Sequence, residues 1–376
     1  MSSEPTNHCD VVIVGAGLAG SAAAIQLRRQ GLRVTLVDPN PVFPRLFRAE
    51  KIEPDQSELL AKLGLLDVVR ERTRLITEIV RAKGGVVRFR RPVEQLGISY
   101  QDIVNQVRAQ FPQDMDLRIG RVVKIDADVD QPSVTLVDGT VITGRLVVLS
   151  TGMTGDLYQQ LGVQREMVMD ELSSVFGFML VRRDGAPFPF EAVTYRPTGT
   201  AQRLGYLTLF GMGESMRGNL FTYWRTKDAD TREMVKSPDA TLRKVLPGLD
   251  AVIGDFTISG RVEPYRIDLY RMKDCARPGV LLLGDAYQSV CPSTGMGLSK
   301  VLTDVDVFCT ELAPAWFKTP GMPVAKIDEF YRSARKRDVD DRALSAALSG
   351  RRQIVDRSPI WQVRRWIRDW RWATGR

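Results

Sequence analysis

Residues near the amino terminus combine types and spacing that suit the binding of a nucleotide. Gly15, Gly17 and Gly20 follow the pattern GxGxxG, and Asp38 comes 18 residues after the last of them. Glycines at these places permit a tight turn, close approach of a pyrophosphate to the backbone and close packing of a helix. A carboxylate at the place of Asp38 can accept hydrogen bonds from both hydroxyls of a ribose. The chemistry that this pattern indicates is the binding of a dinucleotide.

The segments around these residues have the pattern of a β-α-β unit. Residues 11–14 are a short β-branched apolar run, typical of a strand buried on both faces. Residues 21–30 predict a buried helix, and residues 33–38 predict a second strand. The start of the helix offers free N–H groups and a positive dipole end to phosphates. The acid at position 38 favours FAD or NAD over NADP. A glycine-rich turn in another kind of α/β protein is the alternative.

A second motif lies far downstream, between residues 278 and 297. An apolar run predicts a buried strand that ends in Gly284 and Asp285. Residues 291–297 read CPSTGMG and open a predicted helix that extends from 298 to about 312. The first turn of a helix can stabilise negative charge on a bound group.

Together the two motifs resemble those of the FAD-dependent aromatic hydroxylases, the single-component flavoprotein monooxygenases typified by para-hydroxybenzoate hydroxylase. In that family a Gly-Asp pair places its aspartate on the ribityl chain of FAD, and a PxxGxG stretch brings a helix start to the flavin ring. Asp285, Pro292, Gly295 and Gly297 occupy those places. The resemblance runs from about residue 10 to 312. It implies an α/β fold, with a Rossmann-like FAD-binding domain interleaved with an antiparallel β-sheet substrate domain and followed by C-terminal helices.

The resemblance also assigns cofactor contacts outside the two motifs. Arg48 matches the family's arginine near the pyrophosphate, and Arg45 is a second candidate. Val123 matches a strand residue whose backbone touches adenine, and Gly152 stands where the family has an Ala-Asp-Gly motif. The residues expected to bind FAD are Gly15, Ala16, Gly17, Leu18, Ala19, Gly20, Asp38, Arg45, Arg48, Val123, Gly152, Gly284, Asp285, Pro292, Gly295, Met296 and Gly297.

Two positions depart from the family pattern. Residues 151–156 read TGMTGD, so the acid of the family's Ala-Asp-Gly motif is missing. NAD(P)H is the electron donor that the family implies. A separate flavin reductase and electrons derived from the substrate are the alternatives. Tyr100 stands where the family often has Arg or Gln. A contact with an FAD phosphate is therefore expected to be lost or to pass to Gln101.

The middle of the chain changes to short aromatic and β-branched runs separated by Gly/Pro turns, which predict an antiparallel sheet. We expect residues 1–70, 99–166 and 275–312 to form the FAD-binding domain, 71–98 and 167–274 the substrate-binding sheet domain, and 313–376 a helical basic segment. In the family such a sheet roofs the substrate pocket. Ordinary packing or solvation is the alternative role for each candidate. The candidates are Phe178, Tyr195, Phe210, Tyr223 and Trp224 for lining the pocket, and Arg225 and Arg266 for a substrate carboxylate.

Composition argues against several other kinds of site. The 376 residues include one histidine, His8, and four scattered cysteines, so we expect no metal site, Ser-His-Asp triad or disulfide scaffold. No stretch has 18 uncharged apolar residues, and the amino terminus lacks the pattern of a signal peptide, so we expect a cytoplasmic location. Chemistry is expected to come from a cofactor. The sequence assigns no catalytic acid or base.

The net charge of +8 is concentrated at the carboxyl end. Residues 332–376 hold 13 Lys and Arg against five Asp, so the preceding 331 residues are formally neutral and a nucleic-acid partner is not expected. Residues 358–376 predict a basic amphipathic helix, which suits peripheral contact with an anionic membrane. Packing of this helix on its own domain is the alternative. Its apolar stripe is Ile360, Val363, Ile367 and Trp370, flanked by Arg364, Arg368 and Arg371.

The resemblance implies a monooxygenase that inserts one oxygen atom of O₂ into an aromatic or other electron-rich small molecule through a flavin C4a-hydroperoxide. The alternatives on the same fold are an FAD-dependent halogenase and a geranylgeranyl-type reductase of isoprenoid chains. A halogenase would carry a Trp-x-Trp motif early in the chain and a pocket lysine. Here the only such motif is at residues 370–372, and Lys83, the candidate lysine, precedes a turn. A protein that binds FAD without catalysis is a third alternative.

Overall fold

The apolar runs of the β-α-β unit form the centre of a largely parallel sheet. The computed structural model describes residues 8–46, 48–153, 156–212 and 215–374. β1 (His8–Val14) pairs in parallel with β2 (Val34–Asp38) and β9 (Val141–Leu149), and residues 11–14 are buried, as two-sided cover requires. In space the strands of this first sheet follow the order β6 (Asp116–Ile119), β2, β1, β9, β8 (Ser133–Leu136) and β7 (Val122–Asp126), and β15 (Val280–Leu282) pairs with β9.

A second, mostly antiparallel sheet is built from the middle of the chain. It differs from the expectation at two points. β4 (Arg74–Lys83) and β11 (Ala192–Arg196) are parallel, and β3 (Ala49–Ile52) joins this sheet although residues 1–70 were expected in the FAD-binding domain. The chain between β4 and β11 passes through the first sheet. Because no hairpin joins them directly, they are free to pair in parallel. Its strands follow the order β14 (Phe256–Lys273), β10 (Gln164–Arg182), β13 (Ser215–Thr222), β12 (Leu204–Met212), β11 (Ala192–Arg196), β4 (Arg74–Lys83), β5 (Val86–Ser99) and β3 (Ala49–Ile52).

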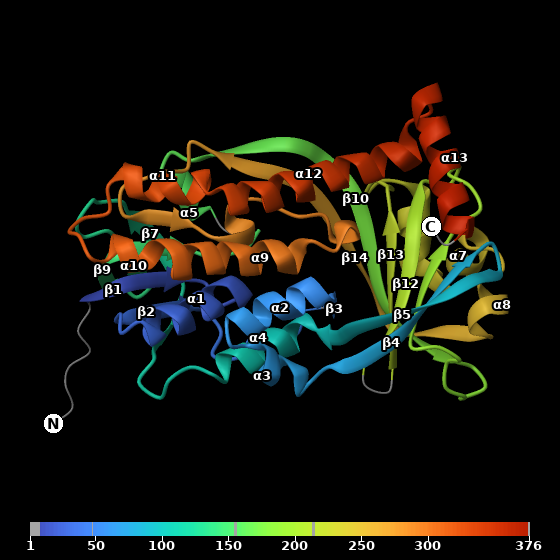
Figure 1. The fold of residues 1–376 in the computed structure, drawn as a ribbon, viewed down its shortest axis with the longest axis horizontal. Coiled ribbons are helices and arrows are strands. Elements are labelled where there is room, and N and C mark those ends of the chain that lie inside the picture. The colour runs from blue at the N-terminus through green and yellow to red at the C-terminus, as the bar shows by residue number, and fades with distance from the viewer. Residues whose placement is uncertain (1–7, 47, 154–155, 213–214, 375–376) are drawn as a thin grey trace.

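Helices cover both sheets and connect them (Figure 1). The helix after β1 begins at Leu18, three residues before the expected start. The predicted helix after residue 298 is α9, which continues into a π-helical segment, η3. The helices are α1 (Leu18–Arg29), α2 (Pro54–Lys62), α3 (Leu66–Arg70), α4 (Tyr100–Arg108), α5 (Leu157–Gln160), α6 (Ala229–Lys236), α7 (Pro238–Val245), α8 (Leu249–Ile253), η1 (Gly284–Ala286), η2 (Pro292–Thr294), α9 (Gly297–Asp306), η3 (Val307–Leu312), α10 (Ala313–Trp316), α11 (Val324–Arg332), α12 (Ala334–Val355) and α13 (Pro359–Thr374).

The second sheet has two different faces. Its outer face packs against α6, α7 and α8 in one apolar core. Three of the aromatic residues proposed for the pocket, Phe178, Tyr195 and Trp224, lie in that core, so this prediction is wrong for them. Side chains alternate between faces along a strand, so the neighbours of these core residues point to the opposite face, toward the first sheet.

The long helix α12 joins the two halves of the molecule. It packs along α9 beside the first sheet and extends over the second sheet (Figure 1). At its far end Arg351 donates a hydrogen bond to the carbonyl oxygen of Leu172, on β10. Within the described residues, no helix is long and apolar enough to cross a membrane, and no group of three or more His, Cys, Asp and Glu side chains is placed to hold a metal ion.

Candidate functional site

The glycine-rich turn has the geometry that its sequence predicts. Gly15 adopts a φ of +99°, and a Cβ on it would lie 2.6 Å from the carbonyl oxygen of Ser150. A Cβ on Gly20 would lie 1.9 Å from the carbonyl oxygen of Gly15. Gly17 differs, because no heavy atom lies within 4 Å of the place of its Cβ. The turn is therefore closed on the protein side and open at Gly17, where a phosphate could approach the start of α1.

Asp38 is fixed beside this turn by contacts that the sequence does not reveal. Its Oδ2 accepts a hydrogen bond from the backbone N–H of Ala16 at 2.7 Å, and Nη2 of Arg108 lies 3.4 Å from the same oxygen. Arg108 also donates through Nε to the carbonyl oxygen of Ala16 at 2.8 Å. The hydroxyl of Ser150 donates to the carbonyl oxygen of Gly15 at 2.6 Å. Arg108 and Ser150, which are distant in sequence, thus fix the position of Asp38 relative to the turn.

In the second motif, one carboxylate oxygen of Asp285 has no hydrogen-bond partner. Gly284 has a φ of +67°, and a Cβ on it would lie 3.2 Å from the Cβ of Ala19, so the Gly-Asp turn lies against α1. Oδ1 of Asp285 is buried and has no hydrogen-bond partner. The carbonyl oxygen of the same residue accepts a hydrogen bond from the hydroxyl of Tyr270 at 2.8 Å. A buried polar atom without a partner is unfavourable, so this oxygen is suited to accept a hydrogen bond from a ligand.

Arg48 connects the second motif to the segment after β2. Its Nη1 lies 3.8 Å from Asp285, its Nε donates to Glu50 at 2.7 Å, and its Cζ lies 4.3 Å from the ring centroid of Tyr100. A Cβ on Gly297 would lie 3.2 Å from Nη2 of Arg48. Desolvation by burial is the largest single influence and opposes the charge of this guanidinium, but Glu50, Tyr100 and Asp285 together outweigh it and raise the pKa of Arg48. In the structure, Arg48 therefore lies in one cluster with the Gly-Asp motif and the start of α9.

Tyr100 does not leave a gap where the family has Arg or Gln. Its ring stacks under Arg48, and its hydroxyl lies close enough to the backbone N–H of Leu18 for that group to affect its pKa, which burial raises. Leu18 is the first residue of α1. The tyrosine hydroxyl therefore reaches the phosphate-binding end of α1.

The start of α9 is electrostatically open. Neither its N-cap residue, Met296, nor any acidic residue of its first turn neutralises the free N–H groups. Gly295 adopts a φ of +70°, and its carbonyl oxygen accepts a hydrogen bond from Nε2 of Gln56 at 2.8 Å. Pro292 begins η2 immediately before it. The end of the helix that carries positive charge is thus free to face an anionic group.

The remaining predicted residues lie at separate places around this centre. Val123 falls at an irregularity in the β7–β8 pairing, and its carbonyl oxygen accepts a hydrogen bond from Gln160 at 2.9 Å. Gly152 has a φ of +67° and open space around it, while Thr154 and Gly155 lie outside the described residues. Arg45 lines a cleft with β10 and β14. This cleft has a volume of about 370 Å³ and is lined by Arg45, Met179, Ser259, Gly260, Arg261 and Glu263.

The inward face of the second sheet borders this cleft and carries an arginine that sequence reasoning missed. Arg217 is 3% exposed and pairs across strands with Met179, a cleft residue. It donates to Oδ1 of Asn219 at 3.0 Å. Burial lowers the pKa of Arg217 to about 9, which leaves it charged near neutral pH. Tyr265, on β14 on the other side of β10, is within reach of the charges of Arg48 and Asp285.

The predictions that Arg225 and Arg266 bind a substrate carboxylate are not supported, and Arg225 is an exposed residue. Arg266 is half exposed and forms ion pairs with Asp268 at 2.9 Å and with Asp170. Its cation is therefore already matched at the surface. Arg217 has the burial and the location that Arg266 lacks. The sequence pattern of the strands could not distinguish Arg217 from Arg266, because neither strand has one face that is clearly polar.

The geometry fits FAD at each half of the cofactor. The open N-terminus of α1 and the carboxylate of Asp38 suit a pyrophosphate and a ribose. The unpartnered Oδ1 of Asp285 suits a hydroxyl group, and the open start of α9 suits the negative charge of a reduced flavin. Ser150, Arg108 and Tyr100 complete the site from other parts of the chain.

Comparison with known proteins agrees with this geometry. The enzyme 6-methylpretetramide 4-monooxygenase of Streptomyces rimosus is 42% identical over 65 residues, which cover 17% of this chain and only 16% of that enzyme. Ubiquinone hydroxylase UbiM of Neisseria meningitidis is 22% identical over 321 residues, covering 80% of this chain and 68% of that protein. The crystal structure of p-nitrophenol 4-monooxygenase PnpA from Pseudomonas putida superimposes with a TM-score of 0.75 at 17% identity, covering 95% and 92% of the two chains.

A family model provides the broadest match. The model for the FAD binding domain aligns with residues 8–318 of this chain, which include β1, the Gly-Asp turn and the whole of α9. Its extent matches the span over which the two motifs and the contacts between them were found. The chain therefore belongs to the family of FAD binding domains.

Proposed function

We propose that the protein is an FAD-dependent monooxygenase that transfers one oxygen atom of O₂ to an aromatic or other electron-rich small molecule. Three features of the structure together support this proposal. The carboxylate of Asp285 has an unused oxygen, the start of α9 is free of acidic residues, and the second sheet borders a cleft of about 370 Å³. A cleft of this size is typical of small-molecule sites.

Each part of the site has a defined task in such a reaction. Bound FAD supplies the redox chemistry and the activation of O₂. The start of α9 stabilises negative charge on the cofactor, and Asp285 and Arg48 hold it in place. The inward face of the second sheet excludes water and orients the substrate. Arg217, a buried arginine on that face, adds a positive charge that favours a substrate with an acidic or polar substituent.

The halogenase alternative is not favoured by the structure. The tryptophan that begins the motif at residues 370–372, Trp370, lies on α13 and is 48% exposed, whereas the cofactor site lies between α1 and α9. Lys83 ends β4 at the turn to β5, as a surface lysine would. Neither residue is placed with the predicted FAD-binding side chains.

The electron donor can be identified by mixing the FAD-loaded protein with NADH or NADPH in the absence of oxygen. We expect one of the two nucleotides to bleach the visible absorbance of the flavin, and the colour to return when oxygen is admitted. Dithionite serves as the control, because it reduces the flavin whatever the natural donor. If dithionite bleaches the flavin and neither nucleotide does, direct reduction by NAD(P)H is wrong, and the electrons come from a separate flavin reductase or from the substrate.

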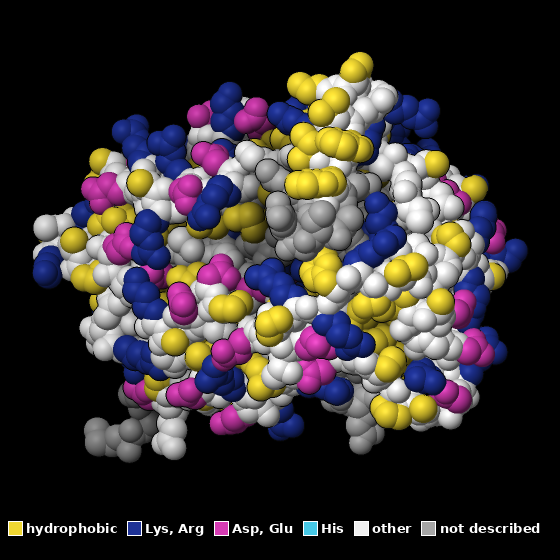
Figure 2. Space-filling model, turned by 45° about the vertical axis from the view of Figure 1, so that its right-hand side comes forward, with side chains coloured by type: hydrophobic (Ala, Val, Ile, Leu, Met, Phe, Trp, Pro, Cys, Tyr) yellow, Lys and Arg dark blue, Asp and Glu magenta, His cyan; other side chains and the backbone are white. Residues whose placement is uncertain are grey.

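We further propose that α13 places the protein on an anionic membrane surface. The helix forms where it was predicted, and it is fixed at its start because Nη1 of Arg365 donates to the carbonyl oxygen of Asp356 at 2.5 Å. Its apolar stripe nevertheless remains largely uncovered, with Ile360 61%, Val363 57%, Ile367 39% and Trp370 48% exposed. Trp366, which lies outside the predicted stripe, is 70% exposed. Figure 2 shows apolar side chains along this projecting helix, with Lys and Arg side chains beside them. The side chains of residues 368, 369 and 371–376 lie outside the described part.

The choice of an anionic lipid surface follows from charge. Residues 332–376 carry a net charge of +8, which an anionic membrane complements and a neutral partner does not. Exposed tryptophan and isoleucine beside arginines are typical of helices that lie in the membrane interface. The cleft lined by Met179, the cross-strand neighbour of Arg217, would then be supplied with apolar substrate from the same surface.

The membrane proposal predicts that replacing Val363 and Trp366 together by serine weakens binding to vesicles of phosphatidylserine and phosphatidylcholine by at least about tenfold. Both side chains are exposed, so the fold should not change. The control replaces Val137 and Val235 by serine, because these are exposed apolar residues away from α13. Cosedimentation measures the binding. Equal binding of the two variants, or no binding by the unaltered protein, would contradict the proposal.

A further inference from the structure

A ring of four buried charges lies behind the Gly-Asp turn. Lys300 and Asp304 are one turn apart on α9, and Lys336 and Asp340 are one turn apart on α12. The pairs within each helix are 2.6 Å and 2.8 Å apart. The pairs between helices, Lys336 with Asp304 and Lys300 with Asp340, are 3.1 Å and 3.5 Å apart. No side chain of the four is more than 3% exposed, and their formal charges cancel.

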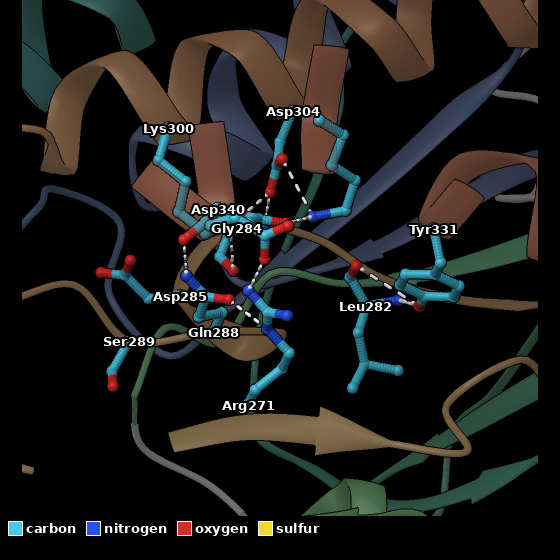
Figure 3. Close-up of polar contacts among 12 residues, drawn as sticks. Arg271, Leu282, Gly284, Asp285, Gln288, Ser289, Lys300, Asp304, Tyr331 and Asp340 are labelled. Carbon is cyan, nitrogen blue, oxygen red and sulfur yellow. Dashed lines mark hydrogen bonds and ion pairs between the residues drawn. The ribbon is translucent and has the colours of Figure 1, made fainter. Parts of the chain in front are cut away.

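This ring holds both backbone groups of Gly284. Oδ2 of Asp304 accepts a hydrogen bond from the N–H of Gly284 at 3.0 Å, and Nζ of Lys300 donates to its carbonyl oxygen at 3.0 Å. Figure 3 shows these side chains converging on the turn, with Asp285 on its other side. Gly284 has a φ of +67°, which glycine adopts readily, and the two hydrogen bonds fix the orientation of its peptide groups. The direction of the Asp285 carboxylate therefore depends on this ring.

Helix α12 also holds the end of the same turn. Nε2 of Gln288 donates to the carbonyl oxygen of Asp340 at 2.9 Å, and Oε1 of Gln288 accepts from Nε of Arg271 at 2.5 Å. Nζ of Lys336 lies 3.9 Å from the ring centroid of Tyr287, a distance typical of a cation–π contact. The segment from 284 to 288 is thus connected to α12 at more than one residue.

Stability alone is a weak explanation for such a ring. Removing four charges from water is costly, and buried ion pairs can often be exchanged for apolar side chains without loss of stability. Burial lowers the pKa of Lys336, which reflects this cost. What apolar residues cannot supply is a pair of hydrogen bonds of fixed direction to Gly284. The arrangement therefore suits the positioning of the turn.

We propose that Lys336 and Asp340 are positioning residues for FAD, which act through Lys300 and Asp304 to aim the carboxylate of Asp285 at the cofactor. Both residues lie on α12, beyond residues 8–318, which match the family model. The C-terminal helix is then part of the cofactor site although it does not touch the cofactor. The inference rests on the FAD site described above.

The proposal predicts different effects on FAD and on ADP, which is the half of FAD that the glycine-rich turn binds. The double variant Lys336→Met/Asp340→Leu removes one positive and one negative charge, so the net charge of the ring does not change. We expect the dissociation constant of FAD to rise at least about tenfold and that of ADP to change less than about twofold, by titration calorimetry. The melting temperature of the FAD-free protein should stay close to that of the unaltered chain.

Two further variants keep the test decisive. Gln288→Leu breaks the uncharged contact between the turn and α12 and should weaken binding of FAD, but not of ADP, even if the double variant fails to fold. Lys326→Met is the matched control, because Nζ of Lys326 donates to the carbonyl oxygens of Trp316 and Gly321, away from the turn. Folded Gln288→Leu protein that binds FAD as tightly as the unaltered chain, or an equal loss of FAD and ADP, would overturn the proposal. Binding of ADP but not FAD by the unaltered protein would instead reject the FAD assignment.

Discussion

Replacing Gly17 by alanine is expected to weaken FAD binding by at least about tenfold while changing the free energy of unfolding of the FAD-free protein by less than about 1 kcal/mol. Gly17 has a φ of −68°, which alanine adopts readily, and no protein atom lies within 4 Å of the place of its Cβ. The added methyl group therefore meets nothing in the protein. It occupies the space through which a pyrophosphate approaches the start of α1.

Two other glycines provide the controls for this variant. Gly20→Ala should lose both FAD binding and stability, because its Cβ would lie 1.9 Å from the carbonyl oxygen of Gly15. Gly199→Ala should lose neither, because its Cβ also meets nothing but lies in a turn of the second sheet domain. Fluorescence titration with FAD and chemical denaturation measure the two effects. Unchanged FAD affinity in Gly17→Ala would contradict the placement of the cofactor at this turn.

Replacing Asp285 by alanine is expected to weaken FAD binding by about tenfold to a hundredfold. The buried Oδ1 of Asp285 has no partner in the protein, and its contact with Arg48 is 3.8 Å long. The carboxylate therefore contributes little to the fold, and the melting temperature of the FAD-free protein should stay the same or rise. This combination is the reverse of what a structural aspartate would give.

The control for Asp285→Ala is Asp184→Ala. Asp184 pairs with Arg182 at the end of β10 and accepts a hydrogen bond from the backbone of Ala186. Its loss should leave FAD binding unchanged. A drop in melting temperature for Asp285→Ala, with FAD affinity retained, would show that this aspartate supports the fold instead of the cofactor.

The sequence predicted the parts of the site that are local in the chain. The glycine-rich turn, Asp38, the Gly-Asp pair and the start of α9 each depend on neighbouring residues, so their spacing carries the information. Arg108, Ser150 and the four charges behind Gly284 were not found, because they act on backbone atoms that are distant in sequence. A buried lysine on a helix has the same pattern as an exposed one until its partner helix is known.

In the second sheet, the sequence could not show which face of a strand each residue occupies. Phe178, Tyr195 and Trp224 were candidates for the pocket, but they lie in the core under α6, α7 and α8. Alternation along a strand divides its residues into two sets, but when both faces are covered both sets are apolar. Arg217 marks the inward face, and it could be recognised only after Leu220 and Met216 were placed in the outer core.

The flavin content of the purified protein is the most direct test of the claim that this chain binds FAD. Protein should be purified, denatured to release any bound cofactor, and compared with FAD and FMN by chromatography, with and without prior incubation in FAD. FAD binding at the glycine-rich turn and the Gly-Asp turn predicts one FAD for each chain after incubation, and a visible flavin spectrum for the intact protein. Protein that is folded and yet retains no flavin under either condition would contradict it.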